Sequence, residues 1–390
     1  MTKYYLKEEE SVGHALINRK TVKENRFMKG NQWEDCWNHR RIKSTITEGK
    51  IPGAKIGKVV QLRNCTELVD CIGQTDKTER ILPVQDQNVE AEQLLQEIRT
   101  QGIHGMGGAA FDTAEKIECV LQADAEQRIL LVNGVSCDPG LLHDRWLLHH
   151  HMQEIEMGVA LLCNAFGFDR VILAVKEPYE VETASTEVRV VPDRYPMGAE
   201  KILLECIPGI SCDAKAVPAK QGVLVLNVQT IYAIYQAHYQ PEMQHIKYIT
   251  VADLHTGIAA IARIQVGQPV YEIAEKTFGD QIGQEDVLYY GGGILLADEA
   301  DRNSVTDDRT GFIGFGQAVH YADDVRCKGC KMCVRRCPVG IDVYKAVRAQ
   351  EKGKKPPVTK EQAALCLQCG ICSYYCRAAK DTMKIIQSLK

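Results

Sequence analysis

The sequence has no long apolar run. No stretch approaches the roughly 18–20 residues that a membrane helix needs, so no transmembrane segment is predicted. Met1 to Val12 are mostly polar and lack the apolar core of a signal peptide, which favours a cytoplasmic location. Neither sign of charge is in large excess: the formal net charge of the 390 residues is −4, so there is no global case for binding nucleic acid.

Cysteine, in contrast, is abundant. The chain has 16 cysteines, of which eight lie between Cys327 and Cys376 and eight are scattered between Cys36 and Cys212. Disulfides are not expected in a reducing compartment, so metal ligation is the better explanation. Cys119, Cys163 and Cys206 lie on apolar helical faces and are expected in the core.

Two cysteine runs repeat with the same spacing. The first is Cys327-x2-Cys330-x2-Cys333-x3-Cys337, and the second is Cys366-x2-Cys369-x2-Cys372-x3-Cys376. A [4Fe–4S] cluster needs four thiolates, one for each iron, and three cysteines at this spacing can wrap a loop around three corners of the cube. The repeat therefore predicts two [4Fe–4S] clusters.

The fourth cysteine of each run points away on the following helix, and in two-cluster ferredoxins it binds the other cluster. We therefore predict two crossed ligand sets: Cys327, Cys330, Cys333 and Cys376 for one cluster, and Cys337, Cys366, Cys369 and Cys372 for the other. The alternative is a pair of structural zinc sites, but zinc ribbons use paired Cys-x2-Cys knuckles and not two copies of a four-cysteine run. Arg377 follows the second run, where the first has Pro338, and a cation near the sulfurs would raise the cluster potential.

The segment between the runs predicts a helical variant of the two-cluster fold. Residues 342–350 and 359–367 are predicted to be helices, separated by a break at residues 353–357. The module is locally basic, which indicates either a solvated face or a surface that docks an acidic redox partner. The basic residues are Lys328, Lys331, Arg335, Arg336, Lys354 and Lys355.

The densest glycine pattern upstream of the cysteines lies in residues 102–116. It contains Gly105, Gly107 and Gly108, and Lys116 lies in the next element. Glycines let backbone N–H groups approach a phosphate closely, and Lys116 would add a cation. The alternative is an ordinary turn, because an amphipathic helix precedes the loop, whereas a dinucleotide-binding fingerprint follows a strand.

Two apolar segments that end on asparagine suggest where a ligand lies. Residues 128–133 end at Asn133 and residues 222–227 end at Asn227, with a helix over 147–167 and a strand over 170–176 between them. This alternation predicts an α/β layer, and such folds place ligands where buried strands end in polar loops.

Together these segments resemble a known family. Residues 102–116 resemble the flavin-binding loop of the NADH-oxidising subunit of respiratory complex I and of the C subunit of the Rnf ion-translocating complex. They also resemble soluble relatives of the latter, such as the cobalamin reductase of propanediol utilisation and a proline-reductase-associated electron-transfer protein. Residues 133–145, 195–201 and 222–230 are similar to further segments of the family, and residues 247–293 resemble its β-grasp (soluble-ligand-binding) domain.

The resemblance implies four parts. They are an N-terminal segment, partly β, over residues 1–90; a complex-I-like, flavin-binding α/β domain over 91–240; a β-grasp domain over 241–305; and a helical two-cluster ferredoxin module over 306–390. FMN would sit with its phosphate over Gly105, Gly107, Gly108 and Lys116, and its ring near Asn133, Asp138 and Asn227. NADH would pass a hydride to FMN, and electrons would leave singly through the clusters to a partner redox protein that docks near the module.

Departures from the family leave two alternatives open. Ala110 replaces a glycine and Asp112 a proline beside the phosphate loop, and Leu226 replaces an asparagine. One alternative is a non-enzymatic iron–sulfur adaptor with a degenerate flavin site. The other is a corrinoid reductase, for which the sequence shows no separate corrinoid motif. Cys137 lies in the ring-side loop, where it would touch flavin or simply pack.

Overall fold

The computed structural model describes residues 68–72, 88–136, 138, 140–176, 183, 186–192, 195–210, 212, 216–242, 245–318 and 325–390. The predictions for residues 1–50 and for Cys137 lie outside these ranges. In the expected N-terminal segment, one short strand is described, β1 (Leu68–Asp70). None of the described helices is long and apolar enough to cross a membrane.

The first layer is a parallel sheet of four strands in the order β4-β3-β2-β5. The strands are β2 (Ile129–Asn133), β3 (Arg170–Lys176), β4 (Glu187–Val191) and β5 (Val223–Asn227). Both faces are buried, so β2 and β5 are continuous apolar runs. This is the α/β layer that the sequence predicts.

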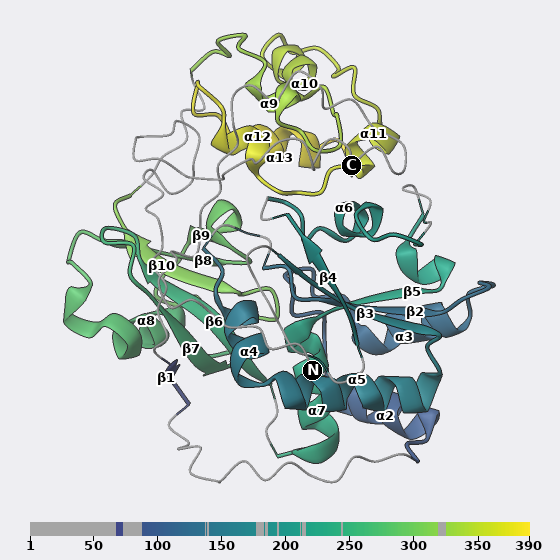
Figure 1. The fold of residues 1–390 in the computed structure, drawn as a ribbon. Coiled ribbons are helices and arrows are strands. Elements are labelled where there is room, and N and C mark those ends of the chain that lie inside the picture. Colours follow the sequence, from purple (N-terminus) through teal and green to yellow (C-terminus); the bar gives the residue numbers. More distant parts are fainter. Residues whose placement is uncertain are drawn as a thin grey trace.

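Helices cover both faces of this sheet (Figure 1). One side holds α2 (Ala91–Thr100), α3 (Thr113–Leu121), α4 (His143–His150), α5 (Met152–Phe166) and α7 (Val228–Tyr239), whose apolar side chains form the largest core. The other side holds α6 (Glu200–Glu205), and the 3₁₀ helix η2 (Pro218–Gln221) precedes β5. Cys119 and Cys163 pack against the first core and Cys206 against the second, as expected.

The helix predicted over residues 147–167 is in fact two helices. The chain breaks between α4 and α5 at His151, whose φ of −130° is not helical. His151 is buried there, and its Nδ1 lies 3.1 Å from Glu154 Oε1. The apolar pattern runs through the break, and this is why the sequence suggested one helix.

The second layer is a mixed sheet of six strands in the order β1-β7-β6-β10-β8-β9. After β1 come β6 (Ile246–Asp253), β7 (Ala259–Gln265), β8 (Val287–Gly291), β9 (Asp298–Glu299) and β10 (Phe312–Gly316). The helix α8 (Val270–Phe278) packs on it, followed by the 3₁₀ helix η3 (Gly279–Gln281), and the 3₁₀ helix η4 (Ile294–Leu296) follows β8. Strand β10 pairs with β6 and β8 and so extends this layer beyond residue 305, where the sequence placed the boundary.

The C-terminal module is helical and repeats internally. It contains α9 (Met332–Arg335), α10 (Val343–Gln350), α11 (Lys360–Ala364), α12 (Ile371–Tyr374) and α13 (Thr382–Gln387). The starts of α9 and α12, and of α10 and α13, are separated by the same offset as the two cysteine runs. Left-handed φ values recur at that offset, at residues 329 and 368, 331 and 370, and 340 and 379. The backbone therefore repeats as closely as the cysteine spacing.

The helix predicted over residues 342–350 is present as α10, and the one over 359–367 is shorter. Asp342 caps α10, and Thr359 forms a capping box with Gln362 at the start of α11. Helix α11 ends at Ala364, because the loop that carries the second cysteine run begins there.

Gly158 tests the packing of α5 on α7. Alanine is normally the better helix former by about 1 kcal/mol, but a Cβ at Gly158 would lie 2.7 Å from the Ile231 carbonyl oxygen of α7. We expect Gly158→Ala to destabilise the fold by about 1–3 kcal/mol in chemical denaturation. Ala160→Gly on the same helix gives the scale of helix propensity alone. A Gly158→Ala variant more stable than the parent would contradict this packing.

Candidate functional site

The glycine loop after α2 is closed at its base. His104 and Asp112 form an isolated bridge, and the amide of Gly105 donates to the carbonyl of Phe111 at 2.8 Å. Asp112 accepts from the Glu115 amide as the N-cap of α3, so the charge that departs from the family pattern has a local structural role. Ala110 has a φ of 50°, a left-handed conformation that suits glycine better.

The crest of this loop offers unused donors. Within the described residues, no hydrogen bond uses the amides of Gly107, Gly108 and Ala109. Gly108 has a φ of 94°, and a Cβ there would meet nothing within 4 Å. Successive free N–H groups in such a turn form a concave site for an anion, so the loop suits a phosphate.

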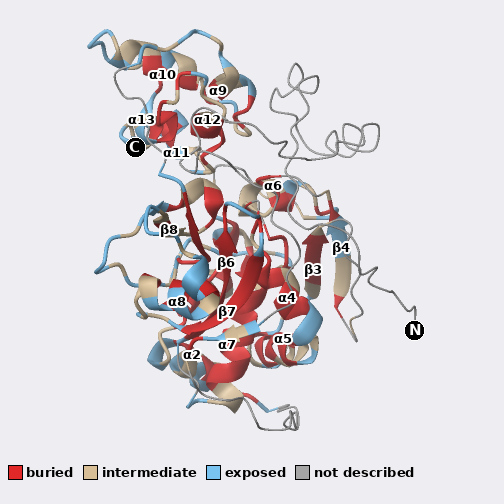
Figure 2. Ribbon diagram, turned by 90° about the vertical axis from the view of Figure 1, so that its left-hand side faces the viewer, coloured by how far each residue is buried: buried red, intermediate tan, exposed pale blue. Residues whose placement is uncertain are grey.

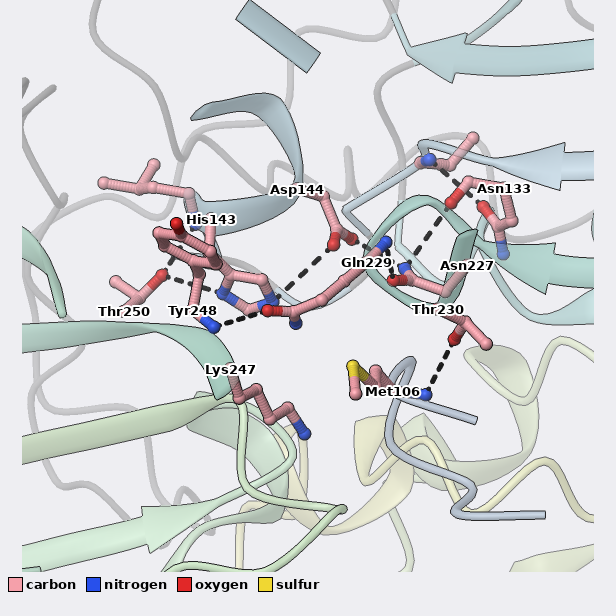
Figure 3. Close-up of polar contacts among 12 residues, drawn as sticks. Met106, Asn133, His143, Asp144, Asn227, Gln229, Thr230, Lys247, Tyr248 and Thr250 are labelled. Atoms are coloured by element: carbon pink, nitrogen blue, oxygen red, sulfur yellow. Dashed lines mark hydrogen bonds and ion pairs between the residues drawn. The ribbon is translucent and has the colours of Figure 1, made fainter. Parts of the chain in front are cut away.

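The loop packs against the carboxyl end of β5. A Cβ on Gly107 would lie 3.3 Å from Asn227 Cβ, so a side chain there would crowd the strand end. The amide of Met106 donates to the Thr230 hydroxyl in the first turn of α7, at 3.0 Å (Figure 3). Asn227 itself caps α7 by accepting from the Gln229 amide.

The two asparagines singled out by the sequence are neighbours. Asn133 and Asn227 are paired in register at the ends of β2 and β5. Asn227 Nδ2 donates to Asp144 Oδ2 at 3.0 Å (Figure 3), and Asn133 Nδ2 donates to the Gly198 carbonyl at 3.0 Å. Asp144 is buried, and the sequence indicated it only as part of a longer loop pattern. Here the amide groups hold loops together.

Lys116 and Asp138 are also engaged within the protein. Lys116 Nζ donates to Glu200 Oε1 at 2.5 Å and to the Val225 carbonyl at 2.7 Å, so it ties α6 to β5. Asp138 accepts from the amide of Ile294 at 2.7 Å, at the start of η4. Gly293 lies so close to Asp138 that a Cβ would be 2.3 Å from its Cγ. The structure thus brings Gly107, Asn133 and Asn227 together and uses Asp138 to join the two layers.

Burial dominates the electrostatics of Asp138. Its side chain is 5% exposed, and this desolvation raises the pKa of the carboxyl group to about 7, while the amides of Ile294 and Leu295 and the charge of Lys176 oppose the shift.

Cysteines of the two runs lie close to one another. Cys337, from the first run, lines a pocket together with Cys366, Cys369 and Cys372 from the second. Cys333 is close enough to Cys372, Cys376 and Cys327 for their charges to interact. Burial is the largest cause that raises the pKa of Cys333 and Cys372 to about 12. A coordinating metal would deprotonate these thiols in spite of the raised pKa.

No three or more His, Cys, Asp or Glu side chains among the described residues converge as a single metal ion would require. A [4Fe–4S] cluster does not require several side chains to converge on one ion, because each thiolate binds a different iron.

The second cysteine loop is in contact with both layers. The Tyr195 hydroxyl, just before α6, donates to the carbonyl of Cys369 at 2.6 Å. Gly370 packs against η4, where a Cβ would lie 2.9 Å from the Leu295 carbonyl oxygen. In Figure 1, α12 and α13 accordingly lie on the side of the module that faces the sheets.

Comparison with known proteins agrees with this geometry. Residues 98–236 match the family described as the Nuo51 FMN-binding domain. They form a complex-I-like FMN-binding domain.

About two thirds of the chain is similar to the C subunit of ion-translocating oxidoreductase complexes. It is 30% identical to the one from Rhodobacter capsulatus over 66% of this chain and 52% of that protein, and 27% identical to one from Haemophilus influenzae over 70% and 43%. The chain therefore spans about half the length of these relatives. An NAD+-reducing [NiFe]-hydrogenase in its air-oxidised state has a similar fold, with a TM-score of 0.50, 17% identity, and coverage of 77% of this chain and 63% of that one.

The raised pKa of Asp138 gives a pH prediction for this FMN-binding domain. Because the folded-state pKa of about 7 lies above the ordinary 3.8, Asp138 adds stability that is complete below pH 3.8 and is lost as the pH rises through 7. Asp138→Asn should therefore flatten the decline in unfolding free energy between pH 4 and 7, by roughly 1–4 kcal/mol across the window. Denaturant unfolding at a series of pH values measures this. Asp298→Asn, on exposed β9, should follow the parent profile; a parent-like profile for Asp138→Asn would refute the prediction.

Proposed function

We propose that this chain passes electrons from NADH through FMN to two [4Fe–4S] clusters and on to a partner redox protein. The contact of Gly370 and Cys369 with η4 and Tyr195 carries the proposal, because it puts one predicted ligand loop directly against the FMN-binding domain and the β-grasp sheet. A scaffold that kept the two sites apart would not need this contact.

A short series of contacts joins the glycine loop to the cysteine loop. Gly108 and Gly292 approach so closely that a Cβ on Gly292 would lie 4.0 Å from Gly108 Cα. Gly293 then touches Asp138, whose carboxylate holds the start of η4, and η4 touches Gly370. Gly292, Gly293, Asp138 and η4 therefore link the proposed phosphate loop to the loop of the proposed cluster.

The residues of the chain have distinct roles in this proposal. The amides of Gly107, Gly108 and Ala109 would hold the phosphate of FMN, and Asn133 and Asn227 fix the strand ends beside it. FMN, when bound, would convert the two-electron chemistry of a hydride into single electrons, and each cluster would carry one. Lys116 and Asp138 position α6 and η4, which in turn hold the cysteine loop.

A second candidate is an iron–sulfur adaptor that binds no flavin. The observation in its favour is that Lys116, Asn133 and Asp138 all bond within the protein. Similarity to the C subunit of ion-translocating complexes supports, for either candidate, a role beside partner subunits.

FMN binding separates the two candidates. We expect anaerobically purified protein, reconstituted with FMN, to hold one flavin that NADH reduces. Gly107→Val, which pushes against Asn227, should weaken FMN binding by about tenfold or more, while Ala110→Gly, which relieves the left-handed strain, should keep it. Flavin and iron are quantified in each sample, and iron should not change. A parent protein with full iron but no flavin would establish the adaptor instead.

Double substitutions test the crossed ligand sets. Cys337→Ala with Cys369→Ala removes two ligands of one predicted cluster, so about four irons should remain. Cys337→Ala with Cys330→Ala, two cysteines of the same run, should damage both clusters. Iron, sulfide and electron paramagnetic resonance spectra of the reduced proteins measure this, and the reverse pattern would show that each run binds its own cluster.

A further inference from the structure

The two ligand sets differ in their surroundings. The loop of the second run is packed against Leu295 and Tyr195. Helix α9, which lies within the first run, and α10, which follows it, are on the far side of the module (Figures 1 and 2). The repeat explains why the module docks in one orientation. Lys331 occupies the position equivalent to Gly370, and its side chain would not fit where Gly370 meets the Leu295 carbonyl.

Charge follows the same division. Exposed cations flank the ligands Cys327, Cys330, Cys333 and Cys376, and we refer to them as the cationic rim: Arg326, Lys328, Lys331, Arg335 and Arg377. Among the residues directly adjacent in sequence to the other four ligands, the only charged one is Arg336, which is 5% exposed. Arg335 lies two residues from both Cys333 and Cys337. The remaining neighbours are apolar or neutral, among them Leu365, Leu367 and Gln368.

The rim has no carboxylate to neutralise it among the described residues. No ion pair there joins a rim residue to Asp or Glu; Lys331 instead lies over the ring of Tyr344, 5.5 Å from its centroid. Residues 325–390 contain fifteen Lys and Arg but four Asp and Glu, a formal charge of +11, which leaves −15 for the rest of the chain. The excess of positive charge is therefore confined to this module.

Balancing the clusters' own charge does not require the rim. Arg336 and Lys380 are buried within the module, where the low dielectric makes a cation effective. Charges on exposed side chains are screened by water and salt, and act mainly by steering a partner of opposite charge to the surface.

We propose that the cationic rim is the docking surface for an acidic one-electron carrier protein, and that the cluster held by Cys327, Cys330, Cys333 and Cys376 is the exit for electrons. The proposal rests on the proposed function. One electron passes at each encounter, so one NADH reduces two carrier molecules and leaves NAD+ and one H+.

The test uses the holoprotein and a plant-type [2Fe–2S] ferredoxin as an acidic probe. Lys328→Glu with Lys331→Glu reverses two rim charges. Lys360→Glu with Lys384→Glu makes the same change in charge on α11 and α13, away from the first run, and serves as the matched control. Binding is measured by calorimetry at several salt concentrations, and ferredoxin reduction by NADH is followed in parallel. Iron content verifies that both variants keep their clusters.

We expect the rim variant to bind ferredoxin at least about tenfold more weakly at low salt, with a shallower salt dependence, and the control to change by less than about twofold. Equal losses in both variants would overturn the proposal. So would rim-dependent binding to phosphatidylglycerol vesicles without binding to ferredoxin, which would make the rim a membrane contact.

The outcomes also separate this proposal from the proposed function. If NADH reduces the flavin and clusters in both variants but rim reversal leaves ferredoxin reduction unchanged, the exit surface is wrong and the function stands. If NADH reduces nothing in the parent protein while ferredoxin still binds through the rim, the NADH-dependent function fails and the docking surface stands.

Discussion

The arrangement of the molecule depends on the close approach of Gly370 to the carbonyl oxygen of Leu295. A Cβ at this position would be 2.9 Å from that oxygen, so any other residue would push the cysteine loop off the 3₁₀ helix η4. The same loop accepts a hydrogen bond from Tyr195 through the Cys369 carbonyl, so two independent contacts fix it. Because electron transfer requires cofactors to be close and fixed, the proposed activity depends on this backbone contact as well as on the cofactor ligands.

In the proposed flavin site, the backbone and the side chains have different roles. The free amides of Gly107, Gly108 and Ala109 are available to an anion, whereas Lys116, Asn133 and Asn227 are bonded to other parts of the chain. Side chains fixed in this way hold the strand ends and the loop in place before a ligand arrives, which lowers the ordering cost of binding. The left-handed Ala110 and the capping Asp112 show that the loop keeps its shape despite two departures from the family pattern.

The features that could be predicted from the sequence are those determined by residues close together in the chain. The cysteine runs, the apolar strands ending at Asn133 and Asn227, and the caps at Asp342 and Thr359 all lie within a few residues of what they determine. The roles of Asp138 and Lys116 could not be predicted, because their partners Ile294 and Glu200 are 156 and 84 residues away. For the same reason the place of β10 in the second sheet was missed, since its pairing with β6 joins segments that are far apart in the chain. The break at His151 was missed because His151 is itself buried, so the helical spacing of buried positions continues across the break.

An internal repeat would give electrons no direction if its halves were equivalent, and here they are not. The backbones match, down to the left-handed residues at equivalent positions, but the side chains diverge where the two halves face different surroundings. Gly370 corresponds to Lys331, and Tyr375 to Arg336, whose guanidinium carbon lies 4.7 Å from the centroid of the Tyr375 ring. Gly370 lets one half fit against the rest of the protein, whereas Lys331 in the other half is exposed. A symmetric pair of sites thus becomes an ordered pair, with one side turned toward the proposed flavin and the other toward solution.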